Sequence, residues 1–138
     1  MSKLSDQLRI HEGVRSHVYL CTAGYETIGV GRNIAESGIG LSDDEIDYLL
    51  ENDIKRCKQE LISLSWFADL DSVRQDAIVN LCFNLGLTRL MGFRNAMGAM
   101  AIGDYEKAAD EFLDSRWAKQ VGQRSLDVAH MIRTGEYP

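Results

Sequence analysis

The sequence predicts an α+β fold, with a small β-hairpin lobe near the N-terminus and a mostly helical remainder. The segment from Val18 to Gly31 is rich in β-branched and aromatic residues and is punctuated by glycines, which is typical of a small sheet. After Ile34 the apolar residues recur at helical spacing, and no further strand pattern follows. A chain of 138 residues has the size of one domain, so we expect a single domain over residues 1–138.

A first helix is predicted directly after Ser2, which can cap it, and Gly13 supplies the signal for its end. This helix would carry Glu12 in its last turn. Its apolar residues are Leu4, Leu8 and Ile10.

The hairpin lobe is expected over residues 14–41. "VYL" and "YETIGVG" read as strands joined by the turn "CTAG", and "NIAESGIG" reads as a loop or a short third strand. The sequence therefore predicts a sheet of two or three strands, with Cys21 at the tip of a hairpin.

A long helix over residues 42–62 is predicted to connect the two lobes. Ser42 and Glu45 have the spacing of a capping box at its start. The helical lobe would comprise residues 63–138 together with the first helix. Its predicted helices are 71–85, between Asp71 and Gly86, and then 93–102, 104–114, 116–120 and 122–133.

The charge of the chain argues against nucleic acid as a partner. The net charge is −6, and the ten acidic and four basic side chains between Ser42 and Asp76 account for all of it. A nucleic-acid-binding domain normally carries a basic face, whereas this acidity is typical of a solvated helix face.

The sequence lacks the patterns of metal sites, of phosphate-binding loops, of membrane spans and of signal peptides. There is no metal-ligand spacing and no phosphate-binding glycine loop, so we expect no metal and no cofactor. No apolar run is long enough to cross a bilayer, and the N-terminus lacks the apolar core of a signal peptide. We therefore expect synthesis as a soluble cytoplasmic protein without a membrane anchor.

The three cysteines fall into two groups, and all are expected to be reduced. Cys57 and Cys82 lie in apolar helical rows and are predicted to fill the core. Cys21 instead lies in a glycine-rich hairpin, close in sequence to Thr27.

Glu12 is the first candidate for chemistry. At the end of a helix it faces the negative end of the helix dipole, which disfavours the carboxylate and suits a general acid; the alternative is an ordinary surface glutamate. Inverting glycoside hydrolysis needs such an acid and, across a cleft, groups that position and activate a water. Cys21 and Thr27, on a hairpin that could face Glu12, are of suitable types.

A cysteine nucleophile with a histidine base is an alternative. The candidate bases are His11, His17 and His130, and neither His11 nor His17 has an evident orienting Asn or Asp nearby in the sequence. The local signatures of cysteine hydrolases are also missing, so we rank this reading lower.

Glu12, Cys21 and Thr27, within "LRIHEGVRSHVYLCTAGYETIGVGR", resemble the catalytic triad of the T4-type phage lysozymes, glycoside hydrolase family 24. The similarity covers nearly the whole chain. "LSDDEIDYLLENDI" resembles the start of the family's interlobe helix, "LDSVRQDAIVNLCFNLG" and "GFRNAM" its central helices, and "SRWAKQVGQRSLDVAHMIRTGEY" its C-terminal lobe.

The resemblance implies a lysozyme-like fold and a muramidase that cleaves the β-1,4 bond between N-acetylmuramic acid and N-acetylglucosamine. It assigns Glu12 as the general acid and Thr27 as a holder of the attacking water, with Cys21 in the place of an aspartate. Arg124 would pair with the catalytic glutamate. The substrate-binding positions that it implies are Leu20, Gly29, Phe83, Asn84 and Arg124.

Three departures from the family pattern change the expectations. A histidine of the family is Arg32 here, and its partner would be Asp53, so we predict an Arg32–Asp53 pair as structural support. The segment 33–41 is shortened, so the outer strand of the small lobe is expected to be missing. The acidic chain would not be attracted to an anionic wall polymer at long range.

The implied setting is that of an endolysin. Peptidoglycan would be its substrate, and the protein would act as a monomer in the periplasm after synthesis in the host cytoplasm. It would depend on a separate holin for access to the wall. The alternative is a peptidoglycan-binding module of the same fold that lost catalysis through the change from aspartate to Cys21.

Overall fold

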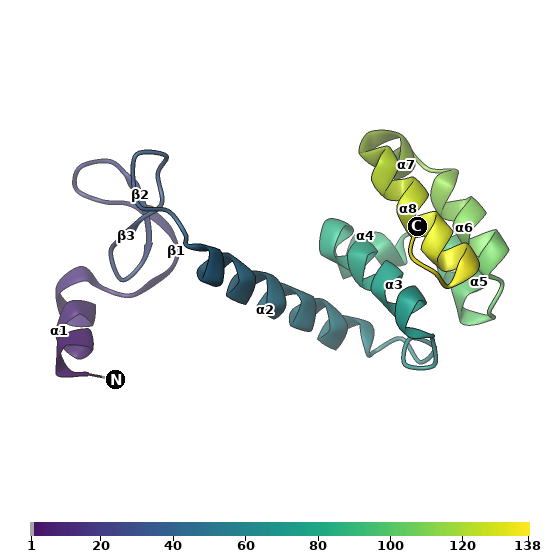
Figure 1. Ribbon diagram of the computed structural model, residues 1–138, viewed down its shortest axis with the longest axis horizontal. Helices are drawn as coiled ribbons and strands as arrows, with labels where there is room; N and C mark the ends of the chain where they lie inside the picture. The colour runs from purple at the N-terminus through teal and green to yellow at the C-terminus, as the bar shows by residue number, and fades with distance from the viewer. Residues whose placement is uncertain (1) are drawn as a thin grey trace. The chain divides into compact units, whose positions relative to one another are not determined.

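The computed structural model describes residues 2–138 and is of the α+β class (Figure 1). It divides into two compact units, Met1–Leu49 and Leu50–Pro138, called the first and the second unit below. The first unit contains the first helix together with the sheet. The expected grouping of that helix with the helical lobe stays a prediction.

The first unit begins with α1 (Lys3–Glu12), capped as expected. The Ser2 side chain accepts a hydrogen bond from the backbone N–H of Ser5, and Gly13, at φ 78°, ends the helix. A positive φ is readily adopted only by glycine, which explains why the helix stops there.

A three-stranded antiparallel sheet follows, with the strands in sequence order. Tyr19 is paired with Thr27, and Ile28 with Arg32. The sequence pattern allowed two or three strands, and the sheet has three; the loss of the outer strand that the shortened 33–41 segment suggested does not occur, because β3 pairs with β2. The strands are β1 (Arg15–Leu20), β2 (Glu26–Gly29) and β3 (Arg32–Asn33).

The long helix α2 (Asp43–Leu61) agrees with the prediction to within one residue at each end. The backbone N–H of Ser42 donates to Glu45 Oε1 over 2.9 Å, and the backbone N–H of Glu45 donates to Ser42 Oγ over 3.4 Å. This is the predicted capping box, which satisfies N–H groups that the first turn leaves without partners. The boundary between the two units lies within α2.

The second unit is helical throughout its regular structure. Asp71 caps α3 by accepting from the N–H of Arg74, and Gly86 ends it at φ 79°, both as predicted. One short helix, α4, was not predicted. The helices that follow α2 are α3 (Ser72–Leu85), α4 (Leu87–Met91), α5 (Arg94–Ala101), α6 (Tyr105–Leu113), α7 (Arg116–Val121) and α8 (Gln123–Thr134).

The hydrophobic core lies in the second unit, where α6 packs on α5 and α8, and α8 also packs on α3. The Phe93 ring lies 5.4 Å from that of Phe112 and 6.4 Å from that of Trp117, centre to centre. Cys57 and Cys82 are buried in the same core, which confirms their predicted place. The largest fully buried side chains are Phe112, Leu61, Ile78, Leu81, Leu90, Met100, Ile132 and Val128.

Arg74 ties the last helix to α3. Its Nε donates to the Ile132 carbonyl over 2.6 Å, and its Nη2 donates to the Arg133 carbonyl over 3.1 Å. Its guanidinium also lies over the ring of Tyr105, 4.0 Å from the ring centre. One side chain thus satisfies two carbonyls in the last turn of α8, which would otherwise lack partners.

None of the helices within residues 2–138 has the length and apolar character that a membrane span requires.

Candidate functional site

Glu12 is the last residue of α1, and its side chain is exposed. The Gly13 backbone turns the chain toward β1 and leaves the carboxylate next to Gly31, in the turn between β2 and β3. Within residues 2–138, no hydrogen bond or ion pair holds this carboxylate. It is therefore open to a ligand, as a proton donor must be.

Cys21 lies in the tight turn between β1 and β2, and its side chain is partly exposed. The N–H of Cys21 donates to the Tyr25 carbonyl over 3.0 Å, and the N–H of Gly24 donates to the Cys21 carbonyl over 2.8 Å. Inside this turn the N–H groups of Tyr25 and Ala23 favour the thiolate and lower the Cys21 pKa from its ordinary value of 9.0. The turn thus promotes the anionic form that could replace a carboxylate.

Thr27, on β2, lies beside Cys21, as the sequence pattern suggested. It is buried, with 3% of its surface exposed, and its Oγ1 donates to the Tyr25 carbonyl over 2.8 Å. The same hydroxyl interacts with the Cys21 sulfur and contributes to the low pKa of that thiol. Because a hydroxyl has one hydrogen and two lone pairs, it can also hold a water.

A cysteine–histidine pair is not formed among the described residues. The ring of His17 lies 3.1 Å from Ser16 Oγ, through Nδ1, and no histidine is among the groups that influence Cys21. The low Cys21 pKa has backbone causes, so the thiol-hydrolase reading gains no support from the geometry.

The predicted Arg32–Asp53 pair is wrong. Arg32 Nη1 donates to Glu45 Oε1 over 2.8 Å and to the Gly40 carbonyl over 2.9 Å, while Asp53 pairs with Arg56 at 3.1 Å. Glu45 lies eight residues before Asp53, about 12 Å along the helix, so it is the nearer acid to the shortened 33–41 segment. The arginine and the N–H of Ser42 lower the Glu45 pKa to about 2.

The remaining predicted residues of the first unit lie on the sheet. Leu20 ends β1 with 66% of its side chain exposed, and Gly29 ends β2 at φ 68° with open space on its side-chain side. Both positions are accessible to a ligand.

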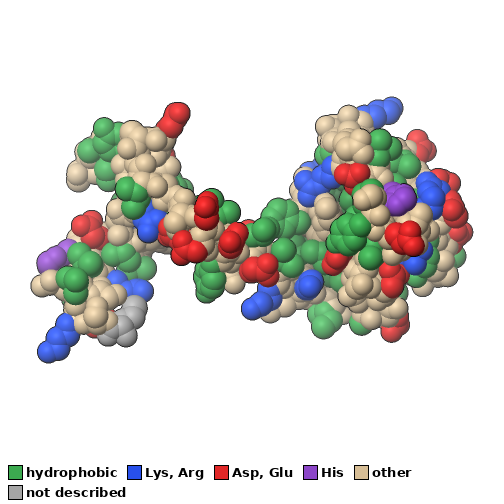
Figure 2. Space-filling model, in the orientation of Figure 1, with side chains coloured by type: hydrophobic (Ala, Val, Ile, Leu, Met, Phe, Trp, Pro, Cys, Tyr) green, Lys and Arg blue, Asp and Glu red, His purple; other side chains and the backbone are tan. Residues whose placement is uncertain are grey.

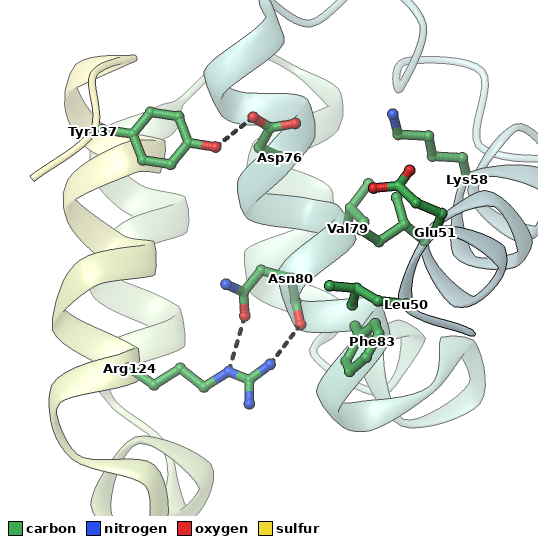
Figure 3. A pocket seen from close by; sticks show the side chains of 10 residues that line it. Leu50, Glu51, Lys58, Asp76, Val79, Asn80, Phe83, Arg124 and Tyr137 are labelled. Atoms are coloured by element: carbon green, nitrogen blue, oxygen red, sulfur yellow. Dashed lines mark hydrogen bonds between the residues drawn. The ribbon is translucent and has the colours of Figure 1, made fainter. Parts of the chain in front are cut away.

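The second unit contains a pocket of about 470 Å³ (Figure 3). Two predicted site residues, Phe83 and Arg124, contribute to it, and Tyr137 donates to an Asp76 carboxylate oxygen at its edge. Its lining residues are Leu50, Glu51, Ile54, Lys58, Asp76, Val79, Asn80, Phe83, Arg124 and Tyr137.

Arg124 is oriented by Asn80, as Figure 3 shows. Its Nε donates to Asn80 Oδ1 over 2.9 Å, and its Nη2 donates to the Asn80 carbonyl over 3.3 Å. These two bonds leave the remaining N–H groups of the guanidinium for another partner. The predicted pairing with Glu12 stays a prediction.

Phe83 and Asn84 differ in their surroundings although they are neighbours on α3. The Phe83 ring faces the pocket and has 44% of its surface exposed. Asn84 Oδ1 instead accepts from the buried Trp117 indole N–H over 2.7 Å. Asn84 therefore connects α3, which also carries Phe83, to α7.

Acidic side chains along α2 are exposed, as the charge pattern predicted, and Figure 2 shows them on this face of the molecule. Asp43, Asp44, Asp47 and Glu51 are among them. No group of three or more metal-ligating side chains that could hold an ion is found in the part of the chain that the structure describes.

Sequence reasoning missed four residues around the site. Glu45 was predicted only as a helix cap, and nothing in the sequence linked it to Arg32. Asn80 could have been found, because it lies one helical turn before Asn84 and one after Asp76 on a predicted helix. Gly31 was interpreted only as a glycine that the hairpin turn needs. Trp117 was noted only as part of the segment that resembles the family's C-terminal lobe.

Comparison with known proteins identifies related sequences. The family model described as phage lysozyme matches residues 9–132. Probable T4-type lysozyme 1 of Dictyostelium discoideum is 28% identical, with 98% of this chain and 96% of that protein aligned. An endolysin of Acyrthosiphon pisum secondary endosymbiont phage 1 is 29% identical over 86% of this chain and 80% of its own. The pre-baseplate central spike protein Gp5 of Enterobacteria phage T4 is 30% identical over 96% of this chain, which corresponds to 28% of that larger protein.

Proposed function

The chain belongs to the phage lysozyme family, whose members are glycosidases, and from this premise we propose that it hydrolyses the β-1,4 bond between N-acetylmuramic acid and N-acetylglucosamine in peptidoglycan. In this proposal Glu12 is the general acid, and Cys21 and Thr27 position and activate the attacking water. Two lysozymes and an endolysin among its relatives support the activity class.

The observation that carries the residue roles is the arrangement within the first unit. Cys21 and Thr27 interact directly in the β1–β2 hairpin, and Thr27 lies on the same strand that leads to Gly31. The carboxylate of Glu12 lies against Gly31. One compact unit thus holds a carboxylic acid, a thiol that favours its anion and a hydroxyl.

The proposed reaction is an inversion. Glu12 gives its proton to the glycosidic oxygen as the bond from that oxygen to the anomeric carbon breaks, and water adds to this carbon from the opposite face. Thr27 holds the water, and the Cys21 thiolate accepts a proton from it or stabilises the positive charge on the sugar. Glu12 and Cys21 regain their starting protonation states by exchange with solvent.

The other predicted residues are proposed to bind the glycan strand. Leu20 and Gly29 offer exposed surface on the sheet, and Phe83 and Arg124 line the pocket of the second unit. Asn84 would act through its bond to Trp117.

The proposed setting is lysis of a bacterial host. The protein would be made in the host cytoplasm, reach the wall through a separate holin and act there as a monomer. Similarity to an endolysin supports this setting.

The experiment measures release of reducing ends from purified peptidoglycan by the wild type, Glu12→Gln and Glu36→Gln. Glu36 is a matched control because it is an exposed glutamate of the same unit without a hydrogen bond or ion pair to the described residues. Loss of a general acid should lower the rate by about 100-fold or more in Glu12→Gln, whereas Glu36→Gln should keep the wild-type rate.

Wild-type protein that binds peptidoglycan without releasing reducing ends would contradict the proposal and favour the wall-binding module. An intact rate in folded Glu12→Gln, combined with complete loss in Cys21→Ser, would favour the thiol hydrolase instead.

A further inference from the structure

Two constraints coincide at Gly31, in the turn between β2 and β3. Its backbone has φ +70°, a conformation that other residues rarely adopt. A Cβ built on this glycine would lie 2.7 Å from Glu12 Oε2, 3.0 Å from Glu12 Cδ and 3.2 Å from Glu12 Cγ. The space that a side chain at position 31 would need is therefore occupied by Glu12.

The other glycines of the first unit with positive φ differ in this respect. Gly13, Gly24, Gly29 and Gly40 have φ between +62° and +85°, and a Cβ on any of them would meet nothing within 4 Å. At those four positions backbone conformation alone accounts for the glycine. At Gly31 the space left for Glu12 is a second and independent reason.

We propose that Gly31 is a positioning residue for Glu12: its missing side chain leaves the space in which the carboxylate is held for proton transfer. This inference rests on the proposed function, since it concerns the general acid named there. No hydrogen bond or ion pair from residues 2–138 holds the Glu12 carboxylate, and its Oε2 lies 2.7 Å from where a Cβ of residue 31 would be.

A methyl group at position 31 should displace the carboxylate, because contacts of 2.7 Å between a Cβ and an oxygen are not tolerated. Proton transfer is sensitive to such shifts, and a displacement of about 1 Å can reduce a rate by about 100-fold. Binding of the glycan at a distance from the acid should change little, so kcat should fall while KM stays nearly constant.

The test compares Gly31→Ala with Gly40→Ala, both made in the full chain. Gly40→Ala places the same residue at a similar φ of +62° but in open space, so it controls for backbone strain. Gly31→Asn is the second variant, because asparagine tolerates positive φ better than alanine and still carries a Cβ. The measurements are kcat and KM for reducing-end release, the thermal midpoint, and the 13C resonance of the Glu12 carboxyl group.

We expect kcat to fall by about 100-fold in both Gly31 variants relative to Gly40→Ala, with KM within about threefold of the wild type. The Glu12 resonance should move in the Gly31 variants and stay in Gly40→Ala. A kcat within about threefold of the Gly40→Ala value, in either folded Gly31 variant, would overturn the inference.

The same measurements distinguish failure of the proposed function from failure of the role of Gly31. Wild-type protein without any reducing-end release would contradict the muramidase proposal and the catalytic consequence of Gly31 together. Release by the wild type, with Glu12→Gln impaired and Gly31→Asn fully active, would contradict only the role of Gly31.

Discussion

The two units of the molecule hold their residues in place by different means. Among the described residues of the first unit, Thr27 is the one buried side chain, whereas the second unit buries 24 apolar side chains and Ser125. The proposed catalytic residues lie in the first unit, which is held together by turns, helix caps and hydrogen bonds. The unit organised by packing supplies the core.

The same contrast applies to the cysteines. Cys21, in a turn of backbone N–H groups, has a pKa below 9.0. Burial, together with the neighbouring Cys57, raises the pKa of Cys82 to about 12. Backbone donors thus make one thiol reactive, and an apolar core makes the other inert.

The largest expected effect is the difference in free energy of unfolding between alanine variants of two leucines, one in each unit. Leu81 is fully buried in the second unit, and Leu20 is 66% exposed in the first. Leu81→Ala should lower the free energy of unfolding by about 2–5 kcal/mol, because it leaves a cavity, and Leu20→Ala by no more than about 0.5 kcal/mol. Urea titration of both variants measures the difference, and equal losses would contradict the distinction between the units.

The pH dependence of activity should report Cys21. Activity should rise with pH as the thiolate forms, with the midpoint below 9.0, because the N–H groups of Tyr25 and Ala23 stabilise the anion. In Cys21→Asp this rise should move to much lower pH, since an aspartate has an ordinary pKa of about 3.9. Reducing-end release measured against pH is the test, and a rise that persists unchanged in Cys21→Asp would refute it.

Alkylation by iodoacetamide supplies a control for that experiment. The modification rate of Cys21 should rise with the same midpoint as the activity, while Cys57 and Cys82 stay unmodified in the folded protein because they are buried.

The smallest effect is expected at the Arg32–Glu45 pair, which is partly exposed. The Glu45 pKa is about 2 in the folded protein, against an ordinary value of 4.5. Its contribution to stability is therefore complete above pH 4.5 and is lost as the pH falls toward 2. Glu45→Gln should be less stable than the wild type near neutral pH, and the two should converge in acid; thermal melts at several pH values test this.

Sequence reasoning succeeded where the determinants are local. The ends of α1 and α3 were predicted because Ser2, Gly13, Asp71 and Gly86 act on neighbouring backbone groups. The short helix α4 was missed because no side chain caps it and five residues show too little periodicity.

The contacts of the candidate site were harder to predict, since they depend on how separate segments meet. The nearness of Cys21 and Thr27 was anticipated because a single hairpin carries both residues. Glu45 as the partner of Arg32 depends on the path of the 33–41 loop, and the orientation of Arg124 by Asn80 joins residues 44 positions apart. The two residues of each contact are far apart along the chain, so no local sequence pattern predicts either contact.

The bonds from Arg74 to the carbonyls of Ile132 and Arg133 have a consequence for the kinetics of folding. They close a loop of nearly 60 residues, because the partners are 58 and 59 positions apart. During synthesis, α3 leaves the ribosome long before its partner α8 has been translated. The helical unit therefore completes its core only once α8 has emerged, while the hairpin can form within its own short segment.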